Sequence, residues 1–193
     1  MRNTLRGCVV VLSLLAILAV DCAAKKKPKS EPDPVFMTIG NVCVLPIVDA
    51  RAGKKAGVNL EKLQKSVAGV IKKKRYSVSS TDTPGVTGEI AVEDVEAADP
   101  TYVKKLGPTN ERWVMVVFLD DITSKITFGS TGNAELSGYL FDKQDGRLIW
   151  KNKGVGQAGQ GGLAGMAMKG MMKGEAMSNA IGSLLSSIPK RPK

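Results

Sequence analysis

Few residues of this sequence have the types and spacing that catalysis requires. Histidine, the usual general base of enzymes and the commonest metal ligand, is absent. Of the cysteines, Cys8 lies in an N-terminal apolar run, so a processed chain could keep only Cys22 and Cys43, too few for a structural zinc site. Cys43 alternates with apolar neighbours and is expected to be buried. We therefore predict no catalytic residue, no metal and no cofactor.

Asp120 and Asp121 are the carboxylates best placed for acid/base chemistry, because they follow the most apolar strand expected after the N-terminal run. Adjacent residues on a strand point to opposite faces, so this pair is not expected to converge on one substrate. The glycines of Gly154-Val-Gly156-Gln-Ala-Gly159 have the spacing of a dinucleotide-binding loop. Such a fold continues with a further parallel strand, whereas one predicted helix follows here, so we expect no nucleotide.

Residues 1–21 have the three parts of a secretory signal peptide. Arg2 and Arg6 give a basic start, residues 8–20 are apolar, and small residues follow. The apolar run is shorter than the roughly 20 residues of a membrane-spanning helix. We therefore predict export of the chain.

Cys22 stands where bacterial lipoproteins carry their acylated cysteine, and residues 18–20 before it are similar to a lipobox. Asp21 departs from that pattern, which has Gly, Ala or Ser at this position. We predict that Cys22 is lipidated and anchors the protein in the outer membrane, facing the periplasm. The alternative is cleavage after Ala24, which would leave a soluble periplasmic protein.

The chain is basic, with a formal net charge of +10. Its lysine and arginine runs contain few aromatic residues, whereas nucleic-acid surfaces combine basic grooves with aromatic side chains that stack on bases. No nucleic-acid partner is therefore expected. In an exported protein, anionic lipid or cell-wall glycan would be the matching polyanion.

The pattern of apolar residues predicts a single α/β (α+β) domain. A mixed sheet of five to six strands should be covered by an early amphipathic helix beginning at Asn59 and by a C-terminal helix. The expected organisation is a polar Pro/Lys-rich tether over 22–40, the domain over 41–153, a Gly/Met-rich flexible segment over 154–174, and the C-terminal amphipathic helix over 175–188. The predicted strands are 42–48, 76–78, 113–119, 122–128, 134–141 and 147–152.

A resemblance to a known group is carried by the opening strand, the strand at Tyr76 and a late hairpin. The opening reads Val44-Leu45-Pro46-Ile47-Val48-Asp49, and the hairpin reads Leu140-Phe141-Asp142-x-x-Asp145-Gly146-Arg147-Leu148-Ile149-Trp150. Over roughly residues 40–188 the chain resembles envelope lipoproteins with a TolB-amino-terminal-like domain, which include CsgG, LpoB and small neisserial surface lipoproteins. The resemblance implies a membrane-tethered, non-enzymatic module that binds other proteins and often forms oligomers.

Together these features predict a scaffold or accessory factor that binds an envelope protein partner, or further copies of itself, in envelope assembly or secretion. The segment 154–174 is either the contact, because methionines on a flexible backbone adapt to partners, or a disordered linker to the last helix. One alternative is a binder of anionic lipid or cell-wall glycan. Another is an enzyme that uses Asp120 or Asp121 with a lysine.

Overall fold

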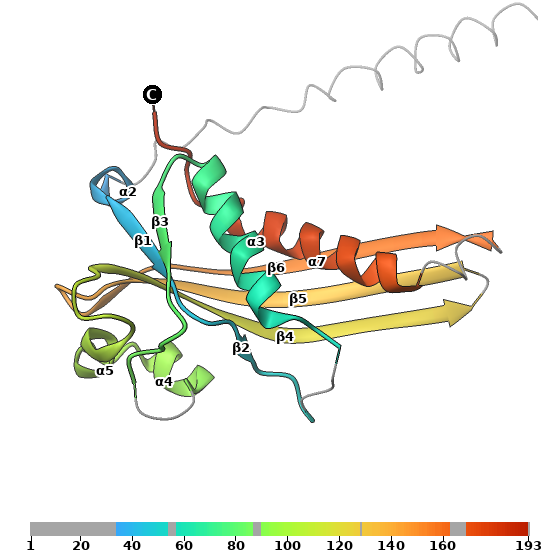
Figure 1. The fold of residues 1–193 in the computed structure, drawn as a ribbon, viewed down its shortest axis with the longest axis horizontal. Coiled ribbons are helices and arrows are strands. Elements are labelled where there is room, and N and C mark those ends of the chain that lie inside the picture. Colours follow the sequence, from blue (N-terminus) through green and yellow to red (C-terminus); the bar gives the residue numbers. More distant parts are fainter. Residues whose placement is uncertain (1–33, 54–56, 87–89, 128, 163–168, 193) are drawn as a thin grey trace, which may run out of the picture. The chain divides into compact units, whose positions relative to one another are not determined.

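The structure is a computed structural model that describes residues 34–53, 57–86, 90–127, 129–162 and 169–192. These residues form one mixed sheet with helices on both faces, which confirms the predicted α+β fold class (Figure 1). The strand order is β3-β1-β4-β5-β6, and β2 also pairs with β4. The strands are β1 (Asn41–Val44), β2 (Val48–Asp49), β3 (Ser77–Ser80), β4 (Trp113–Thr127), β5 (Gly129–Asp142) and β6 (Arg147–Gly161).

The sheet has a parallel half and an antiparallel half. β1 runs parallel to both β3 and β4, and β2 pairs with β4 further along. β4, β5 and β6 form a long antiparallel meander. The two expected strands 113–119 and 122–128 are in fact one strand, β4, with a register shift between Leu119 and Asp121. A bulge accommodates the extra residue and lets pairing continue, so the polar Asp120-Asp121 pair does not end the strand.

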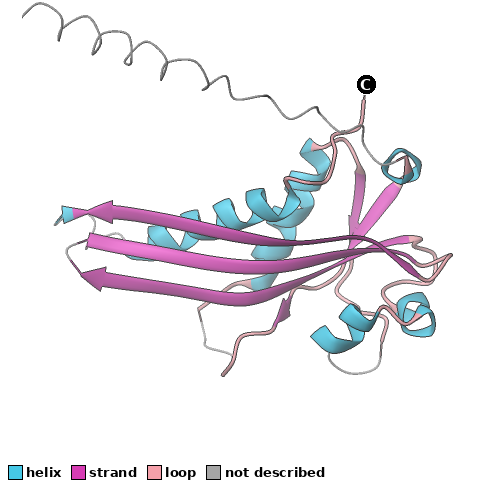
Figure 2. Cartoon of the chain, turned by 180° about the vertical axis from the view of Figure 1, so that it is seen from behind, coloured by secondary structure: helices cyan, strands magenta, loops and turns pink. Residues whose placement is uncertain are grey.

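Helices α3 (Leu60–Lys73) and α7 (Lys169–Leu185) cover one face of the sheet, and α4 (Val92–Ala97) and α5 (Pro100–Lys105) lie on the other (Figure 2). Because strand side chains alternate, β4 contributes to both cores. Met115 and Val117 pack on the α3 and α7 side, whereas Val114 and Phe118 pack on the α4 and α5 side. Helix α4 lies in a stretch where the sequence analysis predicted neither a helix nor a strand.

Helix α3 begins as its sequence predicts. The Asn59 side chain accepts a hydrogen bond from the backbone N–H of Lys62 at 2.8 Å, which caps the first turn. Leu63, Val67 and Ile71 recur at helical spacing and are buried against the sheet.

The prediction that residues 154–174 form a flexible segment is wrong for most of that length. Residues 154–161 belong to β6 and residues 169–174 to α7, while 163–168 lie outside the described residues. The glycines serve close packing: a Cβ on Gly154 would lie 2.3 Å from the carbonyl oxygen of Ala180, and one on Gly156 would lie 2.0 Å from that of Ala176. The absence of side chains lets the backbone of α7 rest on the strand.

The domain also begins before the expected end of the tether at residue 40. A short helix, α2 (Val35–Thr38), follows Pro34, and the side chains of Phe36 and Ile39 are buried in the core. A single helical turn has too few residues to show a helical period in sequence, so it was not predicted.

Candidate functional site

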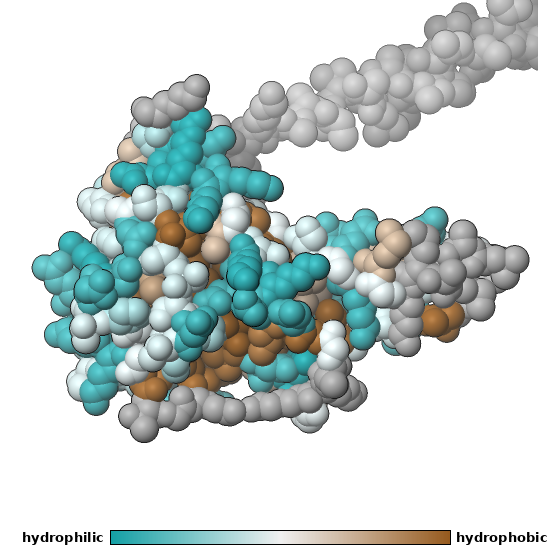
Figure 3. Space-filling view, in the orientation of Figure 1, coloured by the Kyte–Doolittle hydropathy of each residue, from teal (hydrophilic) through white to brown (hydrophobic). Residues whose placement is uncertain are grey.

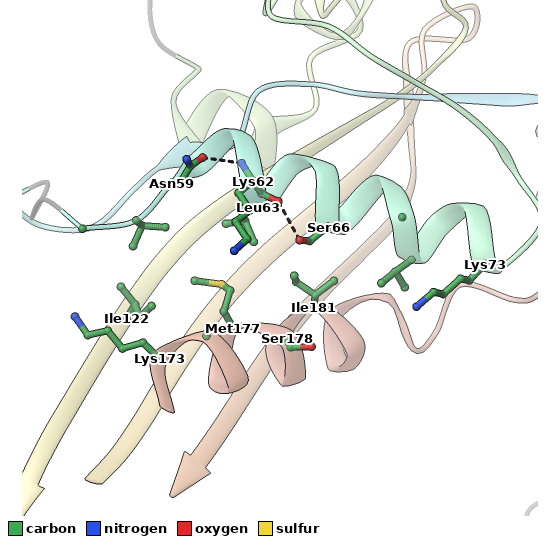
Figure 4. A pocket seen from close by; sticks show the side chains of 15 residues that line it. Asn59, Lys62, Leu63, Ser66, Lys73, Ile122, Lys173, Met177, Ser178 and Ile181 are labelled. Carbon is green, nitrogen blue, oxygen red and sulfur yellow. Dashed lines mark hydrogen bonds between the residues drawn. The ribbon is translucent and has the colours of Figure 1, made fainter. Parts of the chain in front are cut away.

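A groove of about 620 Å³ lies between α3 and α7, and we call it the α3–α7 groove. Figure 4 shows side chains of both helices pointing into it, with Ile122 of β4 and Lys173 of α7 at one end and Lys73 of α3 at the other. The groove exists because small residues face each other across it. These residues are Ser66 and Gly69 on α3 and Gly174 and Ser178 on α7.

The groove has an apolar floor. Leu63 and Ile181 are buried, while Val70, Ile122 and Met177 are partly buried and remain open to a ligand. In Figure 3 apolar surface shows beside and below the polar side chains of α3. An apolar floor in an open groove can desolvate the apolar face of a bound segment.

The charges on the groove all have one sign. Lys62, Lys73 and Lys173 line it, and no acidic residue is among its described lining residues. The groove therefore has an apolar centre and a positive edge, which together fit a ligand that is both amphipathic and acidic.

Asp120 lies on the sheet face opposite α3 and α7. Its carboxylate accepts a hydrogen bond from the Ser137 hydroxyl at 2.5 Å. Burial raises the pKa of Asp120, and the Ser137 hydrogen bond and the Lys153 charge only partly offset this.

Asp121 has a different neighbour. Its charge, added to the stronger effect of the Asp49 carboxylate that binds Arg51, helps to raise the pKa of the Arg51 guanidinium. Leu119 and Ile122, on either side of the Asp120-Asp121 pair, both pack on the α3 and α7 side, so the bulge breaks the strict alternation that was expected for this pair. The two carboxylates nevertheless have different partners.

Beside Asp120, a second polar cluster joins α4 to the sheet. One carboxylate oxygen of Glu96 accepts hydrogen bonds from the Tyr139 hydroxyl at 2.9 Å and from the Lys151 ammonium at 2.7 Å. The bond from Lys151, with that from Tyr139, lowers the pKa of Glu96, while burial and the same contact raise the pKa of Tyr139. The contacts hold Glu96 ionised and Tyr139 neutral, which favours a fixed structural link between α4 and the sheet.

The cysteines were the other candidates from the sequence. Cys22, the predicted lipidation site, lies outside the described residues. Cys43 is a free thiol, 1% exposed, and its burial raises its pKa. The thiol therefore stays protonated and packs as a small apolar side chain, as the sequence indicated.

Within the described ranges, no group of three or more acidic or cysteine side chains could hold a metal ion. The described helices are also all too short or too polar to cross a membrane.

Sequence reasoning did not find the α3–α7 groove. Of its lining, only Lys173 and Gly174 fall in the expected contact segment 154–174. The available signal was the pair of small residues at helical spacing on each helix, Ser66 with Gly69 and Gly174 with Ser178. Such residues are also common on solvated helix faces, so the signal acquires meaning only once the two helices are known to be neighbours.

No protein-family model matches this sequence, and no curated protein matches it significantly. Several solved structures are similar in fold. The PelC dodecamer from Paraburkholderia phytofirmans is 14% identical with a TM-score of 0.47, over 79% of this chain and 89% of that one. Lipoprotein GNA1162 from Neisseria meningitidis is 15% identical with a TM-score of 0.46, over 67% and 91% of the two chains.

The C-terminal domain of LpoB from Salmonella enterica is 13% identical with a TM-score of 0.37, over 61% of this chain and 83% of that one. Bacterial lipoproteins are therefore among the structures to which this chain is similar. Identities and TM-scores of this size transfer no residue role.

Proposed function

We propose that this chain is a non-enzymatic envelope lipoprotein that binds a protein partner by seating an acidic amphipathic helix of that partner in the α3–α7 groove. The single observation that carries the proposal is the groove itself, whose floor is apolar and whose charged lining residues are all lysines. Anchoring through Cys22 is supported by the order of leader, cysteine and polar tether in the sequence.

A helix is the occupant that best fits this geometry. A third helix laid between two helices places its apolar stripe on their side chains and keeps its own backbone hydrogen bonds internal. Met177, at the centre of the groove, is an adaptable contact because its unbranched side chain can repack against different partners.

The lysines decide which helix is accepted. Lys62, Lys73 and Lys173 would face the flanks of the bound helix, so glutamates there gain attraction while lysines there are repelled. The groove thus discriminates by charge among helices that have the same apolar stripe.

Two synthetic peptides test the groove. Both carry the same apolar stripe at helical spacing, one with glutamate and one with lysine on its flanks. In methyl NMR of the protein, we expect the acidic peptide alone to shift Ile122, Met177 and Ile181. Equal shifts with both peptides, or shifts confined to the opposite sheet face, would contradict the proposal.

A matched pair of variants ties binding to the groove. Ser178→Trp fills the groove from an exposed position and should abolish the shifts. Ser183→Trp makes the same change at an exposed position of the same helix outside the groove, and should leave acidic-peptide binding intact.

A further inference from the structure

A second surface gathers positive charge where α3 ends. The C-terminal segment is fixed there by three hydrogen bonds: Arg191 N–H to the Lys74 carbonyl at 3.0 Å, the Lys74 ammonium to the Ile188 carbonyl at 2.6 Å, and the Tyr76 hydroxyl to the Pro189 carbonyl at 3.0 Å. These bonds bring two separate basic runs of the sequence together. We call the resulting set the basic end, and its members are Lys72, Lys73, Arg75, Lys190 and Arg191.

The basic end is not neutralised by the domain. Within the described ranges, none of its members forms an ion pair with an acidic side chain. All are exposed except Arg191, which is half-buried with its guanidinium 5.8 Å from the centre of the Tyr76 ring. Hydrophilic surface covers this part of the molecule in Figure 3. The five like charges repel one another, and an external anion bound among them would offset this repulsion.

Arg75 gives an independent indication. Its φ is 73°, in the left-handed region where the residue after a helix is usually glycine. An arginine at this position strains the backbone. Backbone strain that is retained where glycine would relieve it is a common sign of a functional site. Here the strained residue, Arg75, adds one more cation to the basic end.

The described chain also starts at this end. Helix α2 lies beside the C-terminal segment, and the Arg191 guanidinium donates to the Met37 carbonyl at 3.5 Å (Figure 1). Cys22 precedes Pro34 by a dozen residues, which span at most about 40 Å when fully extended. An anchor at Cys22 would therefore hold the basic end within reach of the bilayer.

From these observations we propose that the basic end is a membrane-contact surface for the headgroups of anionic phospholipids. The inference rests on the proposed envelope anchoring for its setting, but the basic end, and not Cys22, makes the contact. Lysine and arginine held at an anionic surface each strengthen binding about fivefold, and the effect decays within a Debye length of about 10 Å. The contact would orient the domain on its tether and hold the α3–α7 groove at a fixed height above the membrane.

The test uses the chain from residue 22 with Cys22→Ser, so that no acyl chain contributes. Sedimentation with phosphatidylethanolamine vesicles is compared with and without phosphatidylglycerol. We expect binding only to the vesicles that contain phosphatidylglycerol, and loss of that binding in high salt. Binding that is absent, or equal on both vesicle types, would overturn the inference, whatever the state of Cys22 in the cell.

Two triple variants with the same loss of charge locate the surface. Lys72→Gln, Arg75→Gly and Lys190→Gln together should lower vesicle binding about 100-fold. This variant should keep its thermal midpoint, because glycine relieves the strained position, and it leaves the groove lysine Lys73 in place.

The matched variant removes three exposed lysines elsewhere, at Lys104, Lys105 and Lys125. We expect it to bind as the parent chain does. An equal loss in both triple variants would mean that net charge alone drives binding, and no loss in the first would exclude the basic end.

Discussion

Asp142 shows at the scale of single residues how a charge is held inside the fold. Its side chain is fully buried at the end of β5 and accepts two hydrogen bonds from the Arg112 guanidinium, at 3.0 and 2.7 Å. Burial alone would raise the pKa of Asp142, but Arg112 and the backbone N–H groups of Gln144 and Asp145 together bring it below its usual value. The carboxylate thus fixes the β5–β6 turn in its ionised form.

We predict that Asp142→Asn lowers the free energy of unfolding by about 1–3 kcal/mol at pH 7, because a buried charge-assisted bidentate contact is lost. The folded-state pKa lies below the unfolded one, so this stabilisation is present above the unfolded pKa and is lost as pH falls through the folded pKa. Urea unfolding of parent and variant should therefore differ at pH 7 and converge in acid.

Asp145→Asn is the matched control in the same turn. Asp145 is exposed and pairs with Arg147 at 3.3 Å, so its loss should change stability by at most about 1 kcal/mol. A parent-to-variant difference at Asp142 that grows on acidification would contradict the assignment of its pKa.

The sequence singled out Asp142 only as part of a hairpin motif. The predicted strands 134–141 and 147–152 imply a turn between them, and Gly146 in that turn adopts a φ of 64°. The partner, Arg112, lies 30 residues earlier, and no local pattern relates the two. Long-range pairs of this kind depend on strand register, which the sequence leaves open.

At the scale of elements, the contact between α7 and the sheet depends on glycines. Gly132 of β5 and Gly154 and Gly156 of β6 all lie beneath the helix, where a Cβ would lie within 2.6 Å of helix backbone atoms. Asn152 and Asn179 add hydrogen bonds across the same contact, to the Leu184 and Gln157 carbonyls. The helix is therefore held closer to these strands than side chains would allow.

We predict that Gly156→Ala destabilises the fold by about 1–3 kcal/mol, because the new methyl group would force α7 away from β6. Gly161→Ala in the same strand should have almost no effect, since nothing lies within 4 Å of its Cβ position. The thermal unfolding midpoints of the two variants are compared. Equal thermal midpoints for Gly156→Ala and Gly161→Ala would mean that α7 does not rest on the glycines.

The sequence predicted the existence of α7 but not the role of these glycines. Gly154, Gly156 and Gly159 matched a nucleotide loop by spacing, and their density suggested flexibility. A strand that lies under a helix has the same composition, and only the tertiary partner distinguishes the two. The apolar stripe of α3, by contrast, was predictable because its period of 3.6 is a local property.

For the whole molecule, the two proposed surfaces occupy different places. The α3–α7 groove opens between the two helices on one face of the sheet, and the basic end lies where α3 stops and the C-terminal segment begins (Figure 1). One residue, Lys73, belongs to both. A partner helix in the groove would therefore sit close to the membrane-contact surface.

The proposed anchoring of the molecule depends on Cys22. We predict that the mature protein purified from envelopes begins at Cys22 and carries the mass of diacylglycerol and a further acyl chain. Intact-mass spectrometry measures this directly, and Cys22→Ser should abolish the added mass. A first residue of Lys25 with no acyl mass would show that cleavage follows Ala24 instead.

The measurement that tests partner binding most directly is site-specific photocrosslinking in living cells. A photoreactive residue is placed at Ser66 or Ser178 in the groove, or at Gln157, an exposed residue on the opposite sheet face. Mass spectrometry then identifies the crosslinked peptide. Adducts from both groove positions should map to one protein, in a segment with apolar residues at helical spacing and acidic flanks. Adducts that form equally from Gln157, or that map to basic or non-helical segments, would contradict the proposal that the groove binds an acidic amphipathic helix.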